Sequence, residues 1–388
     1  MRIGLDARFL THPQRGGFKT YTVNLINAIH RLDDENQYFI YLDRTTDMDK
    51  LPVKSNFNYS IVNGTLPVIG MPVREQMLLR RQISKDQLNV FHSLCNTAPI
   101  APSVKNITTL HDTIQVTTKI RWMDEPGFKY WMIMAYSKWA IKSFINSLGT
   151  IITVSEFEKK QIAELFNLPM DRIAVTHLAA NSIFKPANPK EMRVMGNEIE
   201  KKFGVSGDFI LGVGFEDRKN IPLLIKAYKQ IVSEFPDTNL VIVSAEEKKR
   251  QNFQQLVREL HLDRQVIVLG SVTATDLLGL YNLAKVFVFP SERESFGLPP
   301  LESIACGTPT VVMNSSSLPE ILGEGALLID GSDPKRWGET LRRILTDEKL
   351  QAEMIVRGLK RARELSWDNC ARKTIQVYTQ LVRDSVSD

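Results

Sequence analysis

The segment 286–309 restricts the possible folds of this chain more than any other. Residues 286–289 form a continuous apolar run of valine and phenylalanine, which is typical of a parallel strand covered on both faces. The consecutive prolines 299–300 suit the first turn of a helix, where amide hydrogens have no intrahelical partner. The segment therefore predicts a buried strand, a loop, and a short helix that begins at the carboxyl end of the strand.

The loop before this helix has the composition of a ligand-binding loop. Phe296, Gly297 and Leu298 place backbone amides at a helix N-terminus, where anions are favoured and glycine allows a ligand to approach closely. Glu294 and Glu302 flank these amides, and carboxylates accept hydrogen bonds from hydroxyl groups. This layout fits a diphosphate between hydroxylated rings, as in a nucleotide-sugar. Taken alone, the two glutamates are more simply explained as a helix-terminus preference and a solvated loop charge.

Apolar runs of the same kind recur along the chain and alternate with helical or irregular segments. This alternation predicts an α/β fold with parallel sheets and helices on both faces. A chain of 388 residues is long enough for about two domains. The periodic pattern lapses over 181–192, which we predict to be the linker. The other expected strands are 2–5, 38–42, 57–62, 89–92, 107–110, 151–154, 173–175, 239–243, 266–269, 309–313 and 326–329, together with one that begins at 209 and leads into the loop holding Arg218 and Lys219.

Composition excludes several classes of protein. The formal charge of +5, from 49 Lys and Arg against 44 Asp and Glu, is too small and dispersed to predict nucleic-acid binding. Cys95, Cys306 and Cys370 lie far apart, so we expect neither a disulfide framework nor a thiolate metal site. We find no signal-peptide pattern and no run of about 20 apolar residues, so we expect a cytoplasmic protein.

The residues of the 286–309 segment resemble the signature of glycosyltransferase family 4, a group of retaining enzymes with the GT-B fold. That resemblance implies two Rossmann-like domains facing across a cleft, with an acceptor domain at 1–185 and a nucleotide-sugar domain at 186–366. A terminal helix within 367–388 would cross back to the first domain. The matching residues are Pro290, Ser291, Glu294 to Pro299, Glu302, Ala305, Gly307 and Pro309.

The resemblance also implies roles for the residues of this loop. Glu294 would face the donor sugar, Glu302 would hold the ribose, and the amides of Phe296 to Leu298 would bind phosphate or sugar. Val272, which follows another predicted strand, would contact the nucleotide base.

Arg218 and Lys219 stand just before a predicted helix. Two cations are unfavourable there unless an anion binds nearby, although surface charge would explain either residue singly. The run Arg218-Lys219-Asn220 resembles the family's arginine-lysine-asparagine motif, whose cations neutralise the donor diphosphate. Many members carry Gly-Arg where this chain has Gly214-Phe215, so Arg218 must supply that arginine's function or the diphosphate is held more weakly.

Three positions in the first half extend the resemblance. Gly16 and Gly17 resemble a glycine pair that opens a helix and contacts the donor, whereas a lone pair more often marks a turn. His111, at a predicted strand end, resembles the family's histidine near the transferring sugar, whereas a lone histidine is more often structural. By this resemblance we expect His111 to bind substrate, for example by donating a hydrogen bond, and to be a candidate catalytic residue with Arg218, Lys219 and Glu294, through proton transfer near neutral pH in the case of the histidine.

The run Arg74-Glu75-Gln76 and residues 89–93 resemble the branch of polysaccharide-building, mannosyltransferase B-like enzymes. This implies transfer of a hexose, mannose first, from a nucleotide-diphospho-sugar to a glycan or lipid-linked acceptor, with no metal or other cofactor. GDP-mannose is the first donor expected and a UDP-hexose the second. A nucleotide-sugar epimerase and a non-catalytic nucleotide-sugar-binding subunit remain alternatives, because their folds are closely similar.

A predicted helix over 72–84 is basic. Arg74, Arg80 and Arg81 lie in it and Lys85 follows it. The simpler interpretation is a solvated helix whose apolar side packs on a sheet. The second is contact with an anionic lipid or a lipid-linked acceptor, which would place the protein at the inner face of the membrane.

Overall fold

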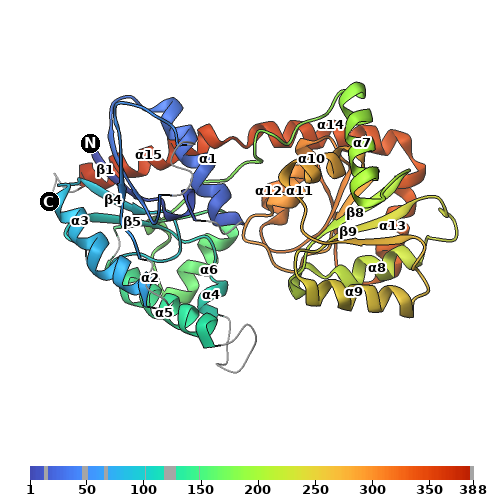
Figure 1. Cartoon of the computed structure of the whole chain (residues 1–388), viewed down its shortest axis with the longest axis horizontal. Helices are drawn as coiled ribbons and strands as arrows, with labels where there is room; N and C mark the ends of the chain where they lie inside the picture. The colour runs from blue at the N-terminus through green and yellow to red at the C-terminus, as the bar shows by residue number, and fades with distance from the viewer. Residues whose placement is uncertain are drawn as a thin grey trace. The chain divides into compact units, whose positions relative to one another are not determined.

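The computed structural model describes residues 1–12, 16–45, 51–64, 69–100, 102–117, 128–147 and 149–384. They form two compact units, Met1–Leu178 with Trp367–Asp388, and Ala179–Ser366. Each unit is built around a parallel sheet with helices on both faces (Figure 1). The predicted α/β class is therefore confirmed.

The sheet of the first unit has the strand order β3-β2-β1-β4-β5-β6-β7 over the described residues. The chain proceeds outward from β1 in one direction and from β4 in the other, so the order reverses between these two strands. Ligands of open α/β sheets bind outside the carboxyl ends of the strands at such a reversal. The strands are β1 (Arg2–Asp6), β2 (Gln37–Leu42), β3 (Phe57–Ile61), β4 (Val90–Ser93), β5 (Lys105–Thr109), β6 (Thr150–Thr153) and β7 (Ile173–Val175).

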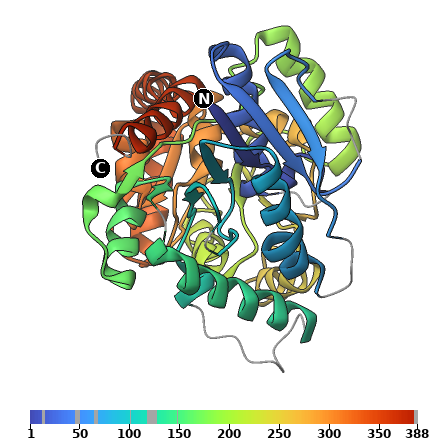
Figure 2. The same ribbon diagram turned by 90° about the vertical axis from the view of Figure 1, so that its left-hand side faces the viewer.

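Helices of the first unit cover this sheet, and the last helix in sequence is one of them (Figure 2). Helix α15 packs beside α1 and contributes the buried Tyr378 to the core. The helices are α1 (Gly17–Leu32), α2 (Gly70–Val73), the π-helix Arg74–Leu79, α3 (Arg80–Lys85), α4 (Ile114–Thr117), α5 (Phe128–Phe144), α6 (Glu156–Phe166) and α15 (Trp367–Asp384).

The sheet of the second unit has the order β10-β9-β8-β11-β12-β13 and reverses between β8 and β11. The four residues of β11 are fully buried, as their continuous apolar run predicts. The strands are β8 (Phe209–Val213), β9 (Asn239–Val243), β10 (Val266–Leu269), β11 (Val286–Phe289), β12 (Thr310–Met313) and β13 (Leu327–Ile329). The helices are α7 (Pro189–Phe203), α8 (Ile221–Lys229), α9 (Glu247–Glu259), α10 (Ala274–Leu283), α11 (Leu298–Ala305), α12 (Leu318–Leu322), α13 (Pro334–Thr346) and α14 (Glu348–Glu364).

The predicted linker 181–192 is wrong in its second part, because α7 begins at Pro189. Asn188 caps this helix: its side chain accepts a hydrogen bond from the Glu191 amide, and the Glu191 side chain accepts one from the Asn188 amide. The division between units lies at 178/179, seven residues before the predicted boundary at 185/186. The physical reason is that Phe184 packs on Tyr281 in the second unit, with ring centroids 5.7 Å apart.

The predicted helix over 72–84 exists as α2, the π-helix and α3 in succession, but Arg74 does not belong to its exposed basic surface. Arg74 is buried and pairs with Asp6, whereas Arg80, Arg81 and Lys85 are exposed. Among the helices that the structure describes, none combines the length and the apolar character needed to cross a bilayer.

A buried hydrogen bond joins α15 to the first sheet and generates a stability prediction. The Tyr378 hydroxyl lies 2.7 Å from Nδ1 of the buried His92, whose Nε2 lies 2.8 Å from the Thr109 hydroxyl. We expect Tyr378→Phe to lower the free energy of unfolding by about 1–3 kcal/mol, because it leaves a buried nitrogen unpaired. Tyr59→Phe is the control, since the Tyr59 hydroxyl bonds the carbonyl of the partly exposed Pro52. Equal urea midpoints for the two variants would contradict this account.

Candidate active site

The structure brings together three of the residues predicted from sequence, Arg218, Lys219 and Glu294. Oε1 of Glu294 lies 2.7 Å from Nζ of Lys219 and 2.9 Å from Nη1 of Arg218. The cations lie on a 3-10 turn, Asp217–Lys219, that follows β8, and Glu294 lies in the loop that follows β11. Because β8 and β11 are neighbouring parallel strands, both loops emerge at the same edge of the sheet.

Burial shields the ion pair between Lys219 and Glu294 from water. Lys219 and Glu294 are 8% and 6% exposed, and the Lys219 ammonium also lies 4.7 Å from the centre of the Phe289 ring. The Arg218 side chain is 31% exposed and bonds Glu216 at 3.2 Å as well. The two carboxylates therefore balance the two cations in this structure. A diphosphate bound to these cations would compete with the two carboxylates for their N–H donors.

Three serine residues hold Glu294 in place: Ser291, which is one of the residues that match the family signature, and Ser316 and Ser317, which the sequence analysis does not single out. The Ser291 hydroxyl donates to the Glu294 carboxylate, and the Glu294 amide donates to Oγ of Ser316 at 2.8 Å. Oγ of Ser317 donates to the Glu294 carbonyl at 3.0 Å. The signal that could have revealed Ser316 and Ser317 is the serine run 315–317, which follows β12, the strand beside β11.

Helix α11 begins at Leu298, at the carboxyl end of β11, as the prolines predict. Gly297 precedes it with a φ of 95°, in the left-handed region, and a Cβ there would lie 2.6 Å from the Leu318 side chain. Glycine is therefore required, and the buried Phe296 anchors the loop beside it. The structure thus places the N-terminal amides of α11 after the loop that carries Glu294.

Glu302 lies on α11, and Val272 lies farther along the sheet. The Tyr281 hydroxyl is 3.5 Å from Oε2 of Glu302. Burial raises the pKa of Glu302 to about 8, which the tyrosine bond only partly offsets. The carboxyl is therefore largely protonated at neutral pH and can donate as well as accept. Val272 follows β10, which β9 separates from β8 in the sheet.

The remaining predicted residues belong to the first unit. Gly16 caps α1 with a φ of 131°, which only glycine adopts readily, and Gly17 is its first residue. The part of the glycine loop at 13–15 lies outside the described residues. Phe18 and Tyr21, on the first turns of α1, have ring centroids 4.9 and 4.6 Å from that of His111. The helix that the glycine pair opens therefore packs on His111.

The hydrogen bond and the burial of His111 define its protonation state. Its Nε2 lies 3.1 Å from the Leu94 carbonyl, which can only accept, so the proton is on Nε2 and Nδ1 is an acceptor. Burial lowers the pKa of His111 to about 4, so the ring is neutral at physiological pH. The neutral ring is suited to accept a hydrogen bond from a hydroxyl group through Nδ1, and a role of His111 in proton transfer stays a prediction.

Comparisons with known proteins show what this chain is similar to. The family model described as "Glycosyltransferase Family 4" matches residues 15–181, and that described as "Glycosyl transferases group 1" matches residues 201–361. O-antigen chain mannosyltransferase B of Escherichia coli is 33% identical over 278 residues, which are 71% of this chain and 70% of that protein.

Two further proteins extend the comparison. Serotype-specific mannosyltransferase WbdA of Escherichia coli is 28% identical over 285 residues, which cover 72% of this chain and 34% of WbdA. The structure of sucrose-phosphate synthase from Thermosynechococcus elongatus matches with a TM-score of 0.73 and 20% identity, over 99% of each chain. The latter shows a shared fold.

The raised pKa of Glu302 predicts a pH-dependent stability. Between its ordinary value of 4.5 and about 8, the folded state holds a proton on Glu302 that the unfolded state has released. The free energy of unfolding therefore falls as the pH rises through this window. We expect Glu302→Gln to remove this contribution, so that the variant gains stability relative to the parent toward the alkaline end. Urea unfolding at both ends of the window tests this; an unchanged difference between the two proteins would contradict it.

Proposed function

The chain belongs to glycosyltransferase family 4, and from this premise we propose that it transfers mannose from a nucleotide-diphospho-sugar to a glycan or lipid-linked acceptor. It is a glycosyltransferase of the GT-B fold. Mannose is proposed because two relatives are mannosyltransferases, one of them 33% identical. O-antigen or a related cell-surface polysaccharide is the proposed product. Neither the epimerase nor the binding-subunit alternative gains support from these relatives.

The observation that carries the proposal is the cluster of Arg218, Lys219 and Glu294. Cleavage of a glycosyl–phosphate bond leaves negative charge on the departing diphosphate. The two cations and the N-terminus of α11 would stabilise that charge. A donor of this kind contributes roughly 3–4 kcal/mol to a developing oxyanion.

Glu294 has two roles in this proposal. Before the donor binds, it pairs with both Lys219 and Arg218, and Glu216 supplies the second balancing charge. When the diphosphate takes over these cations, the Glu294 carboxylate becomes available to accept hydrogen bonds from hydroxyl groups of the sugar. Retention of anomeric configuration follows from attack on the same face of the sugar and requires no enzyme nucleophile.

The other contacts are proposed from the resemblance to the family. Glu302 would hold the ribose, Val272 the base, and the amides of Phe296 to Leu298 the phosphate or sugar. In the first unit Gly16 and Gly17 would contact the donor, and Nδ1 of His111 would accept from a sugar hydroxyl. We propose GDP-mannose as the donor and a UDP-hexose as the second candidate.

The acceptor is proposed to be a glycan or a lipid-linked glycan at the inner face of the membrane. Arg80, Arg81 and Lys85 are exposed beside Met77 and Leu78, which are 64% and 42% exposed. The segment 74–85 carries one carboxylate, Glu75, and that carboxylate is buried. An exposed surface of cations and apolar side chains is suited to anionic lipid headgroups.

The first test of the function removes one cation. We expect Lys219→Ala to lower mannosyl transfer by at least about a hundredfold while the fold is kept, because Arg218 still pairs with Glu294. Lys226→Ala is the matched control, since Lys226 is exposed on the helix that follows the turn. Transfer can be measured from labelled donor to an extracted lipid-linked glycan. Near-parental activity of Lys219→Ala would refute the assignment.

The second test concerns the donor. A ligand at a hundred times its Kd raises the free energy of unfolding by about 2.7 kcal/mol. We expect GDP-mannose to raise the melting temperature of the full chain more than UDP-glucose at the same concentration. Free mannose serves as the control and should have no effect. A larger shift with UDP-glucose would overturn the choice of GDP-mannose.

A further inference from the structure

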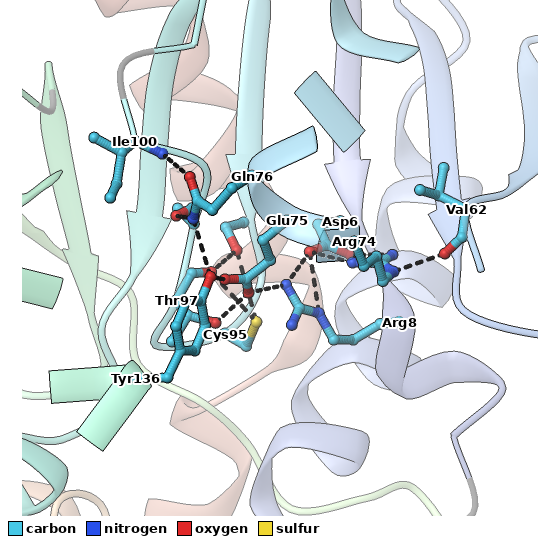
Figure 3. Close-up of polar contacts among 12 residues, drawn as sticks. Asp6, Arg8, Val62, Arg74, Glu75, Gln76, Cys95, Thr97, Ile100 and Tyr136 are labelled. Carbon is cyan, nitrogen blue, oxygen red and sulfur yellow. Dashed lines mark hydrogen bonds and ion pairs between the residues drawn. The ribbon is translucent and has the colours of Figure 1, made fainter. Parts of the chain in front are cut away.

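Four charged residues of the first unit form a buried cluster that the site described above does not use (Figure 3). Asp6 ends β1, and its Oδ1 lies 2.8 Å from Nη2 of Arg74 and its Oδ2 3.1 Å from Nε of Arg8. Arg8 also bonds Glu75, at 2.5 Å. Side-chain exposure in the cluster does not exceed 8%. The cluster lies at the carboxyl ends of β1 and β4, where the strand order of the sheet reverses.

The π-helix Arg74–Leu79 supplies three consecutive side chains to this region. Arg74 bonds Asp6 and donates to the Val62 carbonyl at 2.8 Å. Oε1 of Gln76 accepts from the amide of Ile100 at 2.9 Å. The wider turn of a π-helix changes the spacing of consecutive side chains, and such segments often occur at functional sites.

Glu75 connects this cluster to the loop after β4. Its carboxylate accepts hydrogen bonds from the Thr97 hydroxyl, from the Tyr136 hydroxyl on α5 and from Arg8. The carbonyl of Thr97 in turn accepts from the Ser93 hydroxyl. Glu75 therefore fixes the far end of the segment 93–97, while β4 fixes its beginning.

The same segment holds His111 from its other side. The Asn96 side-chain oxygen accepts from the His111 amide at 2.8 Å, and the Leu94 carbonyl accepts from Nε2 of His111 at 3.1 Å. Within the described ranges, Nδ2 of Asn96 is buried without a hydrogen-bond partner. The Asn96 side chain is therefore held by its bond to His111 and by the backbone of the segment 93–97. Glu75 and Thr97 fix that backbone.

Stability alone does not account for the cluster. Taking four charges out of water is costly, and replacing buried ion pairs with well-packed apolar side chains is often neutral or stabilising. One of these charges, Glu75, also holds Thr97 and so fixes the geometry of the segment 93–97. Through Leu94, that geometry determines which nitrogen of His111 carries the proton.

We propose that Glu75 and Thr97 are positioning residues for His111. They hold the segment 93–97 so that the Leu94 carbonyl keeps the proton on Nε2 and leaves Nδ1 to accept from a sugar hydroxyl. This inference rests on the proposed function, because it requires His111 to contribute to glycosyl transfer. Thr97 is the better residue to test, since valine keeps its shape and leaves the charges intact.

The experiment is a double-mutant cycle on the full chain. We expect Thr97→Val to lower transfer at saturating donor on the order of tenfold in the parent. In a His111→Ala background, which is itself slower, the same change should cause no further loss, because the residue through which Thr97 acts is gone. Glu75→Gln, in both backgrounds, is the second variant and should behave in the same way.

Thr374→Val is the matched control, because it removes another buried hydroxyl of the first unit, one that donates to the Cys370 carbonyl. It should leave transfer unchanged in both backgrounds. Equal losses from Thr97→Val in the parent and in His111→Ala would overturn the positioning role. Full transfer by His111→Ala would overturn it too, while the transferase function would stand or fall with Lys219→Ala.

Discussion

The buried contact between Lys219 and Glu294 is the interaction on which the candidate site depends. An isolated ammonium at this depth would be strongly destabilising, so Lys219 requires Glu294 while no ligand is bound, whereas Glu294 also pairs with Arg218. Their meeting requires β8 and β11 to be neighbours, since the residues are separated by 75 positions in sequence. The topology of the second sheet is therefore what makes a cationic site possible beside a helix N-terminus.

Both sheets carry charged residues at the carboxyl ends of the strands between which the strand order reverses. The two groups of charged residues differ in burial. In the first unit Asp6 and Glu75 meet two guanidinium groups, and every one of these side chains is buried. In the second unit the Arg218 side chain stays 31% exposed, so another anion can approach it. The first arrangement is rigid and neutral, which suits the placement of a neutral imidazole. The second is suited to a charged ligand that must enter and leave.

Much of the fold follows from the sequence because parallel strands are buried on both faces and appear as continuous apolar runs. The run 286–289 coincides with β11, and the prolines 299–300 mark the first turn of α11. Helix α7 was missed because prolines at 186 and 189 indicate a loop, although Asn188 and Glu191 form a capping box that could have revealed it.

Contacts between distant residues could not be predicted in this way. Arg74 carries the same charge as Arg80 and Arg81, and nothing local distinguishes the one that meets Asp6 across 68 positions. The protonation of His111 depends on the Leu94 carbonyl and on burial, which are properties of the folded loop. The loops of the candidate site can thus be predicted from the sequence. Their ion pairs and the tautomer of His111 cannot.

The membership of α15 in the first unit has a consequence for how the protein is made. A growing chain leaves the ribosome with its amino end first. Residues 179–366 therefore emerge before α15, the helix that completes the core of the first unit. Until then the surface of α1 that α15 will cover, and the imidazole of His92, lack their final neighbours. The last segment needed for the core of the first unit is therefore synthesised after the whole of the second unit.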